Sequence, residues 1–243
     1  MTVVSGVAAT APTAPVKEGF TFGGWYTDKE LTKPYAFTEK VSANITLYAK
    51  WIENQSSSDV KEFSDVNSGA WYSDAVIYAV GCGLMRGVSD TEFAPEDNVT
   101  RAMFVTILYR LKGSPAAGSA AFSDVATGEW YSDAVAWASE NGIVSGVSET
   151  EFAPDENITR EQLAAMMLRY AAAEGLDVSV GESTNILSYA DFAAISEYAV
   201  SAIQYAVGSG LINGRSETTL APQDNATRAE TAAIMMRFAK MAE

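Results

Sequence analysis

Residues 122–170, FSDVATGEWYSDAVAWASENGIVSGVSETEFAPDENITREQLAAMMLRY, occur in the chain in three versions. Residues 63–111 are a close copy, and residues 189–238, beginning YADFAAISEYAVSAIQYAVGSG and ending NATRAETAAIMMRF, are a more divergent one. The arginine near the start of the last segment recurs after 59 and then 68 residues, so the second spacer is longer. Repetition at this period predicts units that pack together, because one such unit cannot bury its apolar face alone.

Each copy predicts two helices joined by a loop. In the first copy, Trp71 opens an apolar pattern with helical spacing that continues through Ala75, Val76 and Ala79. In every copy this pattern ends at a glycine, which suits a left-handed helix cap. A threonine then starts the second apolar helix. We expect a mainly α fold of three helix–loop–helix repeats.

The starts of the second helices differ in their capping residues. In the third copy, Thr227 and Glu230 have the spacing of a capping box, in which each side chain satisfies a free donor of the first turn. The second copy has Gln162 at the glutamate position, which can still reach back, whereas Met103 in the first copy cannot. We therefore expect complete boxes in the second and third copies only.

Composition excludes several functional classes. The chain has 243 residues, a formal net charge of −15 and no histidine, and Cys82 is its one cysteine. Acidity of this size disfavours nucleic acid as a partner, and the missing histidines remove the usual general base and metal ligand. No apolar run reaches the length of a membrane span. We expect no enzyme activity, no cofactor, no metal and no membrane insertion, and we interpret Cys82 as a small packed residue at a helix end.

The first 62 residues follow a different pattern. Residues 45–51 alternate, with Ile45, Leu47, Ala49 and Trp51 on one face, which predicts a strand. Residues 52–62 are polar and rich in serine, which is typical of a linker. The predicted organisation is a small β domain at 1–53, a linker at 54–62, repeats at 63–115 and 122–175, a second linker at 176–188, and a third repeat at 189–243.

The three repeats resemble S-layer homology modules, which anchor many bacterial surface proteins to the cell wall. The motifs that carry the resemblance are FSDV, the tryptophan followed by Ala-Val, the G-x-x-x-G spacing, FAP and TRAE. Residues 16–51 resemble, less specifically, a β-grasp-like surface repeat of internalin-related proteins, through GFTFGGWY and ITLYAKW. Such repeats usually begin upstream of residue 1 here, so we expect a fragment of a longer protein that lacks its signal peptide.

The S-layer resemblance implies a fold and a function. It implies a pseudo-threefold arrangement around a central three-helix bundle, which would make the chain a monomer with an internal pseudo-trimer. It implies grooves between repeats that bind a secondary cell-wall polysaccharide, an anionic glycan often ending in a pyruvylated amino sugar. The implied location is the cell wall or S-layer of a Gram-positive-type bacterium. The alternative from another class is a protein–protein interaction or oligomerisation module of a surface assembly.

An arginine follows the capping threonine in every copy. Arg101, Arg160 and Arg228 each lie in the first helical turn, where the helix dipole disfavours a cation by up to about 1 kcal/mol. An anion bound there would reverse the sign, because free N–H groups and the guanidinium would both favour it. The alternative is an ion pair between repeats. We interpret the three arginines as ligand-binding groups and expect their replacement to leave stability nearly unchanged.

Other repeated positions complete the predicted site. The resemblance places Trp71, Trp130 and Tyr198 near the grooves, although aromatic residues that open a helical stripe are more often core. Gly87, Gly146 and Gly214 either satisfy the backbone or let a ligand approach. Nine residues beyond the first arginines lie Arg110, Arg169 and Arg237. Nine helical steps put the two arginines of one helix on opposite faces, so we interpret this second set as structural.

Overall fold

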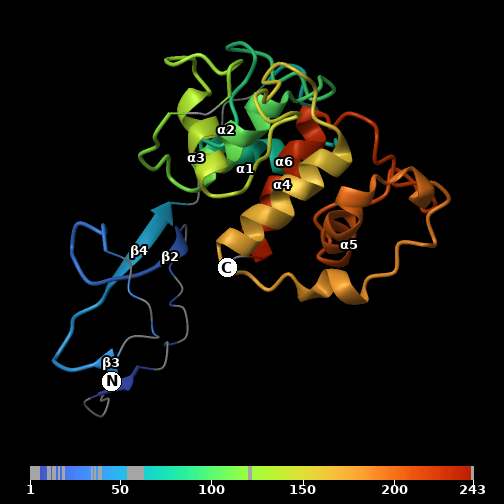
Figure 1. Ribbon diagram of the computed structural model, residues 1–243. Helices are drawn as coiled ribbons and strands as arrows, with labels where there is room; N and C mark the ends of the chain where they lie inside the picture. Colours follow the sequence, from blue (N-terminus) through green and yellow to red (C-terminus); the bar gives the residue numbers. More distant parts are fainter. Residues whose placement is uncertain are drawn as a thin grey trace. The chain divides into compact units, whose positions relative to one another are not determined.

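The computed structural model describes residues 6–9, 12, 15, 17, 20–33, 35, 37, 40–53, 63–119 and 122–241. These residues fall into two compact units, which divide between Val60 and Lys61. The predicted linker at 54–62 lies outside the described residues. In the described part of the chain the two units have different secondary structure, strands in the first and helices in the second (Figure 1).

The first unit contains two antiparallel strand pairs. The strand β2 (Phe20–Tyr26) pairs with β4 (Tyr48–Glu53), with a register irregularity between Phe22 and Trp25. The short strands β1 (Val7–Ala8) and β3 (Lys40–Val41) form the other pair. The predicted strand at 45–51 is displaced toward the C-terminus, since Ile45 is 45% exposed and precedes β4. The β-grasp-like arrangement stays a prediction.

The second unit is built from helix pairs, one pair in each repeat, so the expectation of a mainly α fold is confirmed. The first helices of the three repeats are α1 (Ser73–Gly81), α3 (Ser132–Glu140) and α5 (Val200–Gly208). The second helices are α2 (Arg101–Leu111), α4 (Arg160–Ala173) and α6 (Arg228–Met241). Three short 3-10 turns also belong to this unit, η1 (Ser179–Ser183), η2 (Phe192–Ala194) and η3 (Glu197–Ala199).

The helix ends follow the predicted chemistry. Thr159 and Gln162 form a complete capping box, and Thr227 and Glu230 form the same pair of bonds, with Thr227 N–H donating to Glu230 at 3.0 Å. Thr100 accepts only the backbone N–H of Met103, as expected. The predicted glycines follow the first helices, two residues after each helix ends, and all have φ near +70°. These are Gly83, Gly142 and Gly210.

The extra residues before the third repeat are packed. The turn η1 lies against α5, and Gly181 is buried so close to the Tyr205 backbone that a Cβ would approach the Tyr205 nitrogen to 3.0 Å. Gln204 Nε2 also donates to the Thr184 carbonyl at 3.1 Å. The predicted linker at 176–188 therefore contains a segment that covers the first helix of repeat 3.

The repeats are joined in cyclic order. The first helix of each repeat packs on the second helix of another, giving the pairs α3 with α2, α5 with α4 and α1 with α6. The residues before the second helices pair as isolated bridges, Thr100 with Asn157, Thr159 with Asn225, and Asn98 with Thr227. Repeat 1 thus contacts repeat 2, repeat 2 contacts repeat 3, and repeat 3 contacts repeat 1.

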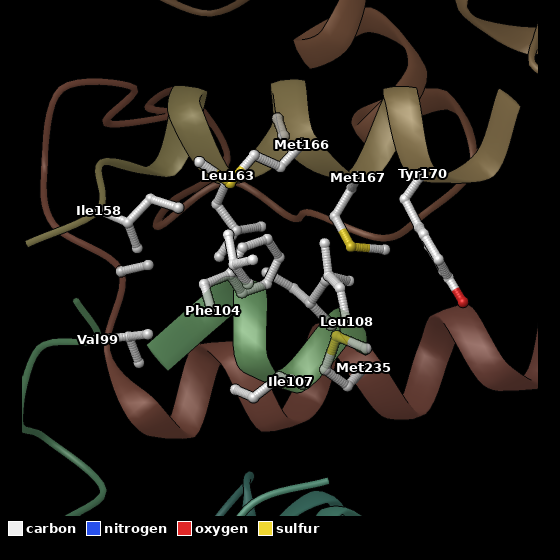
Figure 2. Packing of buried hydrophobic residues seen from close by; sticks show 14 of the residues in the cluster. Val99, Phe104, Ile107, Leu108, Ile158, Leu163, Met166, Met167, Tyr170 and Met235 are labelled. Atoms are coloured by element: carbon white, nitrogen blue, oxygen red, sulfur yellow. The ribbon is translucent and has the colours of Figure 1, made fainter. Parts of the chain in front are cut away.

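The second helices share one apolar core. Figure 2 shows Leu163 and Met167 of α4 pointing toward Phe104 and Leu108 of α2, with Met235 of α6 on the other side. At the far end of these helices the Tyr170 and Phe238 rings lie 5.5 Å apart. Close packing of this kind holds the starts of the second helices, and the arginines there, in fixed positions.

Candidate functional site

The three arginines at the starts of the second helices are buried. Arg101, Arg160 and Arg228 are 4%, 5% and 8% exposed. Each guanidinium extends into the loop of the next repeat in the cycle and donates to two carbonyl oxygens there. Arg101 donates through Nε to Phe152 at 2.8 Å and through Nη2 to Ser145 at 3.1 Å.

The other two arginines make the same contacts in their own neighbours. Arg160 donates to the Leu220 carbonyl at 3.0 Å and to the Asn213 carbonyl at 2.8 Å. Arg228 donates to the carbonyls of Phe93 at 2.8 Å and Arg86 at 2.6 Å. These side chains therefore stabilise the contact between repeats, whatever else they bind.

An ion pair between repeats was the alternative role for these arginines, and one of the three forms such a pair. Arg160 Nη1 contacts Glu230 of repeat 3 at 3.0 Å. Burial lowers the pKa of all three guanidinium groups below the usual range, and nearby carboxylates oppose that shift. An arginine nevertheless stays charged at neutral pH, so each start of a second helix holds a fixed cation.

An aspartate supports one of the two carbonyls that each arginine uses. Asp124 accepts the backbone N–H groups of Phe152 at 2.9 Å and Ala153 at 2.7 Å, so it holds the peptide whose oxygen contacts Arg101. Burial raises the pKa of Asp124, but these two N–H donors and the Arg101 charge outweigh it and the net pKa is lowered. Asp65 and Asp191 make the same pair of bonds in repeats 1 and 3.

Two grooves open beside these arginines, and each is lined by residues from all three repeats. The Arg160 groove has a volume of about 440 Å³ and is lined by Trp71, Arg160, Ile212, Asn213, Gly214, Arg215, Glu230, Ala233, Ile234 and Arg237. The Arg101 groove has a volume of about 380 Å³ and is lined by Arg101, Ser145, Gly146, Val147, Gln162, Ala165, Met166, Arg169 and Tyr198. Nine positions of the two linings correspond, and Ile212 is the one residue of the Arg160 groove without a counterpart in the other lining.

The grooves bring together most of the predicted site residues. An arginine, a glycine and an aromatic residue meet in each, as Arg160, Gly214 and Trp71 do in the first groove. The alternative that the aromatic residues belong to the core does not hold, because Trp71, Trp130 and Tyr198 are 65%, 59% and 55% exposed. Each residue lies just before the first helix of its repeat, where the chain turns at the surface.

The glycines of the loop have a packing reason of their own. A Cβ on Gly87 would lie 2.7 Å from the Glu92 carbonyl oxygen, and a Cβ on Gly146 would lie 2.8 Å from the Phe122 ring. A Cβ on Gly214 would meet the Thr219 carbonyl at 2.8 Å. The loop therefore closes over these positions without room for a side chain, and this closure shapes the groove wall.

Sequence reasoning missed the contribution of the second arginine set. Arg169 lines the groove of Arg101, and Arg237 lines the groove of Arg160, because two helices from different repeats face the same space. The argument from helical periodicity holds within one helix but does not reach across repeats. A structural role is present too, since Arg237 donates to the Leu211 carbonyl at 2.9 Å. Only the cyclic packing of the repeats reveals the pairing.

Charge in the grooves has the opposite sign to the chain. The Arg101 groove is lined by two arginines and no carboxylate, and the Arg160 groove by three arginines and Glu230. Each lining has a formal charge of +2 in a chain whose net charge is −15. The additional cation, Arg215, contacts Glu230 at 3.3 Å and Asp224 at 2.8 Å. Cationic grooves with an exposed aromatic wall favour anionic ligands that carry an apolar face.

Metal binding and membrane insertion have less support in the described residues. Among them no group of three or more histidine, cysteine or carboxylate side chains is placed to hold a metal ion. No described helix is both long and apolar enough to cross a membrane. Cys82 follows α1 and is exposed, so its interpretation as a packed residue is wrong.

Comparison with known families agrees with the repeats. The model of the S-layer homology domain matches residues 62–103, 121–164 and 188–232. The model of the Listeria-Bacteroides repeat domain matches residues 1–50. The matched segments of the first family together cover more than half of the chain, and each contains one of the arginines described above.

Several known proteins are similar to this chain. An amylopullulanase of Thermoanaerobacterium thermosulfurigenes is 34% identical over 72% of this chain and 9% of its own length. A surface-layer 125 kDa protein of Lysinibacillus sphaericus is 32% identical over 72% of this chain and 15% of its own. A cellulosome-anchoring protein of Acetivibrio thermocellus is 27% identical over 63% of this chain and 35% of its own.

This chain thus spans at most about a third of the length of these relatives. Those domains and relatives support a location at the cell surface and a role in anchoring. The chain belongs to the S-layer homology family, with three such domains preceded by a Listeria-Bacteroides repeat.

Proposed function

We propose that the chain attaches a bacterial surface protein to the cell wall without a covalent bond, by binding the anionic ends of a secondary cell-wall polysaccharide in its grooves. One observation carries this proposal. Two grooves of closely matching construction each present two or more guanidinium groups beside an exposed aromatic ring, in a chain that is otherwise acidic.

The ligand class follows from the chemistry of the lining. A guanidinium group binds a carboxylate with geometric specificity, and an exposed indole or phenol ring offers an apolar face to a sugar. A pyruvate ketal on an amino sugar carries both features, a carboxylate and an apolar ring face. The proposed role is binding only, with no cofactor and no catalytic step.

We further propose that the three repeats form a pseudo-threefold assembly around α2, α4 and α6. The cyclic order of the arginine contacts supports this arrangement, because the same donor position reaches the same loop position at all three boundaries. The Arg228 boundary would then carry a third groove, walled by Trp130. Weak binding at several grooves would sum to firm attachment where the polymer chains are dense.

The experiment that tests this function uses purified wall sacculi with the secondary polymer intact or chemically removed. The full chain should bind the intact sacculi, and binding should fall to background after removal of the polymer. Addition of a pyruvate-ketal hexosamine glycoside should displace the bound protein. Binding that survives polymer removal would contradict the proposal and favour a protein–protein module instead.

A further inference from the structure

The aromatic wall of the Arg101 groove is held by a buried carboxylate. The Tyr198 hydroxyl donates to Glu161 Oε1 at 3.0 Å. Ser196 donates to the same carboxylate twice, through its hydroxyl at 2.7 Å and its backbone N–H at 3.0 Å. Glu161 itself is only 2% exposed. Because a buried carboxylate is costly unless its oxygens accept hydrogen bonds, this cluster holds one arrangement strongly.

The position of Glu161 is specific to one boundary. It is the second residue of α4, where the helix dipole favours an anion. The corresponding residues of the other repeats are Ala102 and Ala229. The carboxylate therefore occurs at the boundary whose groove aromatic is a tyrosine, while alanine occurs where that aromatic is Trp71 or Trp130.

The bond to Glu161 decides what the tyrosine can offer a ligand. A phenol has one proton to donate, and here Glu161 receives it. The Tyr198 oxygen can then only accept a hydrogen bond. Trp71, at the same place in the Arg160 groove, carries an indole N–H that can only donate. The two grooves thus present opposite hydrogen-bonding character beside their arginines.

We propose that Glu161 is the positioning residue for Tyr198, and that this pair makes the Arg101 groove select an anionic sugar with a hydroxyl or amide N–H donor facing the Tyr198 oxygen. The inference rests on the proposed function, because it assigns a selectivity to one of the same grooves. The carboxylate of such a ligand reaches Arg101 and Arg169, and the donor lies on the side of repeat 3.

Fixing the ring before binding also raises affinity. A side chain that must be immobilised by its ligand weakens binding by about 0.5–1.5 kcal/mol, so loss of the Glu161 acceptor should weaken this groove roughly threefold to tenfold. The Arg160 groove has no counterpart of this contact and should be unchanged, which makes it an internal control.

The test is an NMR titration of the full chain with the methyl glycoside of a pyruvate-ketal hexosamine. The methyl resonance of Met166 reports the Arg101 groove, which it lines, and the indole N–H resonance of Trp71 reports the Arg160 groove. Glu161→Ala introduces the residue already present at the two equivalent positions. Glu161→Gln keeps an acceptor oxygen for Tyr198 and serves as the conservative control.

We expect Glu161→Ala to weaken binding at Met166 by roughly threefold to tenfold and Glu161→Gln by less than about twofold, with Trp71 unaffected by either. In a Tyr198→Trp background, which restores the Trp–Ala pairing of the other boundaries, Glu161→Ala should have no effect. A loss that persists in that background would overturn the positioning role, as would wild-type affinity at Met166 in Glu161→Ala. Absence of binding at both reporters in the wild-type chain would overturn the proposed function and this inference with it.

Discussion

The Arg101 groove and the Arg160 groove share the same arginine contacts, called the frame here. They differ in several of the other lining residues, called the walls. In both, a buried arginine donates to two carbonyls of the next repeat, and a second arginine faces it from the helix of that repeat. The linings differ at five corresponding positions, and the three that matter most for hydrogen bonding and charge are Tyr198, Val147 and Gln162 in one groove, which correspond to Trp71, Arg215 and Glu230 in the other. These differences preserve the frame while changing the hydrogen-bonding groups beside it.

The comparison of the two grooves also separates a structural role from a ligand-binding role. The arginine after the capping threonine was predicted to bind a ligand, and its burial gives it a structural task as well. The aromatic residue is more than half exposed in every repeat, although at Tyr198 it also donates to the buried Glu161. A ligand-binding test that leaves the fold intact must therefore change the aromatic wall, and a test of the frame must change the arginine.

The largest expected effect is on the frame. Arg160→Ala removes a buried ion pair and leaves two carbonyl oxygens without a donor, so we expect a loss of about 3–5 kcal/mol in the free energy of unfolding. Arg101→Ala lacks the ion-pair term and should cost about 3 kcal/mol. Urea denaturation measures both.

The control for this prediction is Lys112→Ala, which removes an exposed ion pair between repeats 1 and 2. It should change the free energy of unfolding by less than about 1 kcal/mol. If Arg101→Ala were as mild as this control, the arginine would have no structural task, and the original expectation of unchanged stability would be right.

The next effect is on the aspartates that support the carbonyls. Asp124→Asn weakens two backbone hydrogen bonds and should cost about 2 kcal/mol at neutral pH, measured by urea denaturation. The lowered pKa of Asp124 means that its carboxylate stabilises the fold fully above the ordinary pKa of 3.8. That stabilisation is lost as the pH falls through the lower folded-state pKa.

The same titration should occur in repeats 1 and 3, where the pKa values of Asp65 and Asp191 are also lowered. The wild-type midpoint in urea should hence fall steeply below about pH 4, and Asp124→Asn should show a shallower fall. Identical acid profiles for the two proteins would remove Asp124 from this account.

A smaller effect is expected on the walls. Trp71→Ala should weaken binding of a pyruvate-ketal hexosamine in the Arg160 groove by about tenfold, because a ring face worth about 1.4 kcal/mol is lost. The thermal midpoint should not change by more than about 2 °C, since Trp71 is 65% exposed. Titration calorimetry and a thermal melt give the two numbers.

Tyr198→Ala should show the matching loss in the Arg101 groove while leaving the Arg160 groove intact. A loss of binding at both grooves from either single change would mean that the two grooves act as one site, and the comparison between them would fail.

The smallest effect is expected from Arg215→Val. This change places a valine in the Arg160 groove at the position that Val147 occupies in the Arg101 groove. Its ion pairs with Glu230 and Asp224 are partly exposed, so the free energy of unfolding should change by less than about 1 kcal/mol. Affinity for the anionic sugar should fall about twofold to threefold in low salt and less in high salt. An increase in affinity would show that Arg215 blocks the groove.

Much of the fold could be predicted because its determinants are local. Thr159 and Gln162 define a helix start within four residues, and Gly142 defines a helix end through its own backbone angle. Because the pattern recurs in all three repeats, each local inference could be applied three times. The strand predicted at 45–51 was placed less well. Ile45 fits the apolar alternation of the sequence, but it is exposed and lies before β4.

The site could be predicted only in part because its geometry is not local. Arg101 and Arg169 belong to different repeats, and no spacing along the chain indicates that they face the same groove. Glu161 is likewise ordinary in sequence, a glutamate in a first helical turn, and its importance follows from Tyr198 being 37 residues away in sequence and 3.0 Å away in space.

The most direct test of the central claim is retention of the chain on polymer-bearing sacculi after the three exposed aromatic residues are replaced together. The variant Trp71→Ala/Trp130→Ala/Tyr198→Ala should stay folded, with a thermal midpoint lowered by about 2–8 °C, because all three rings are more than half exposed but loss of Tyr198 leaves the buried Glu161 carboxylate with one donor fewer. If the grooves bind the polymer, retention should fall at least tenfold. Wild-type retention by a variant that is folded would contradict the account.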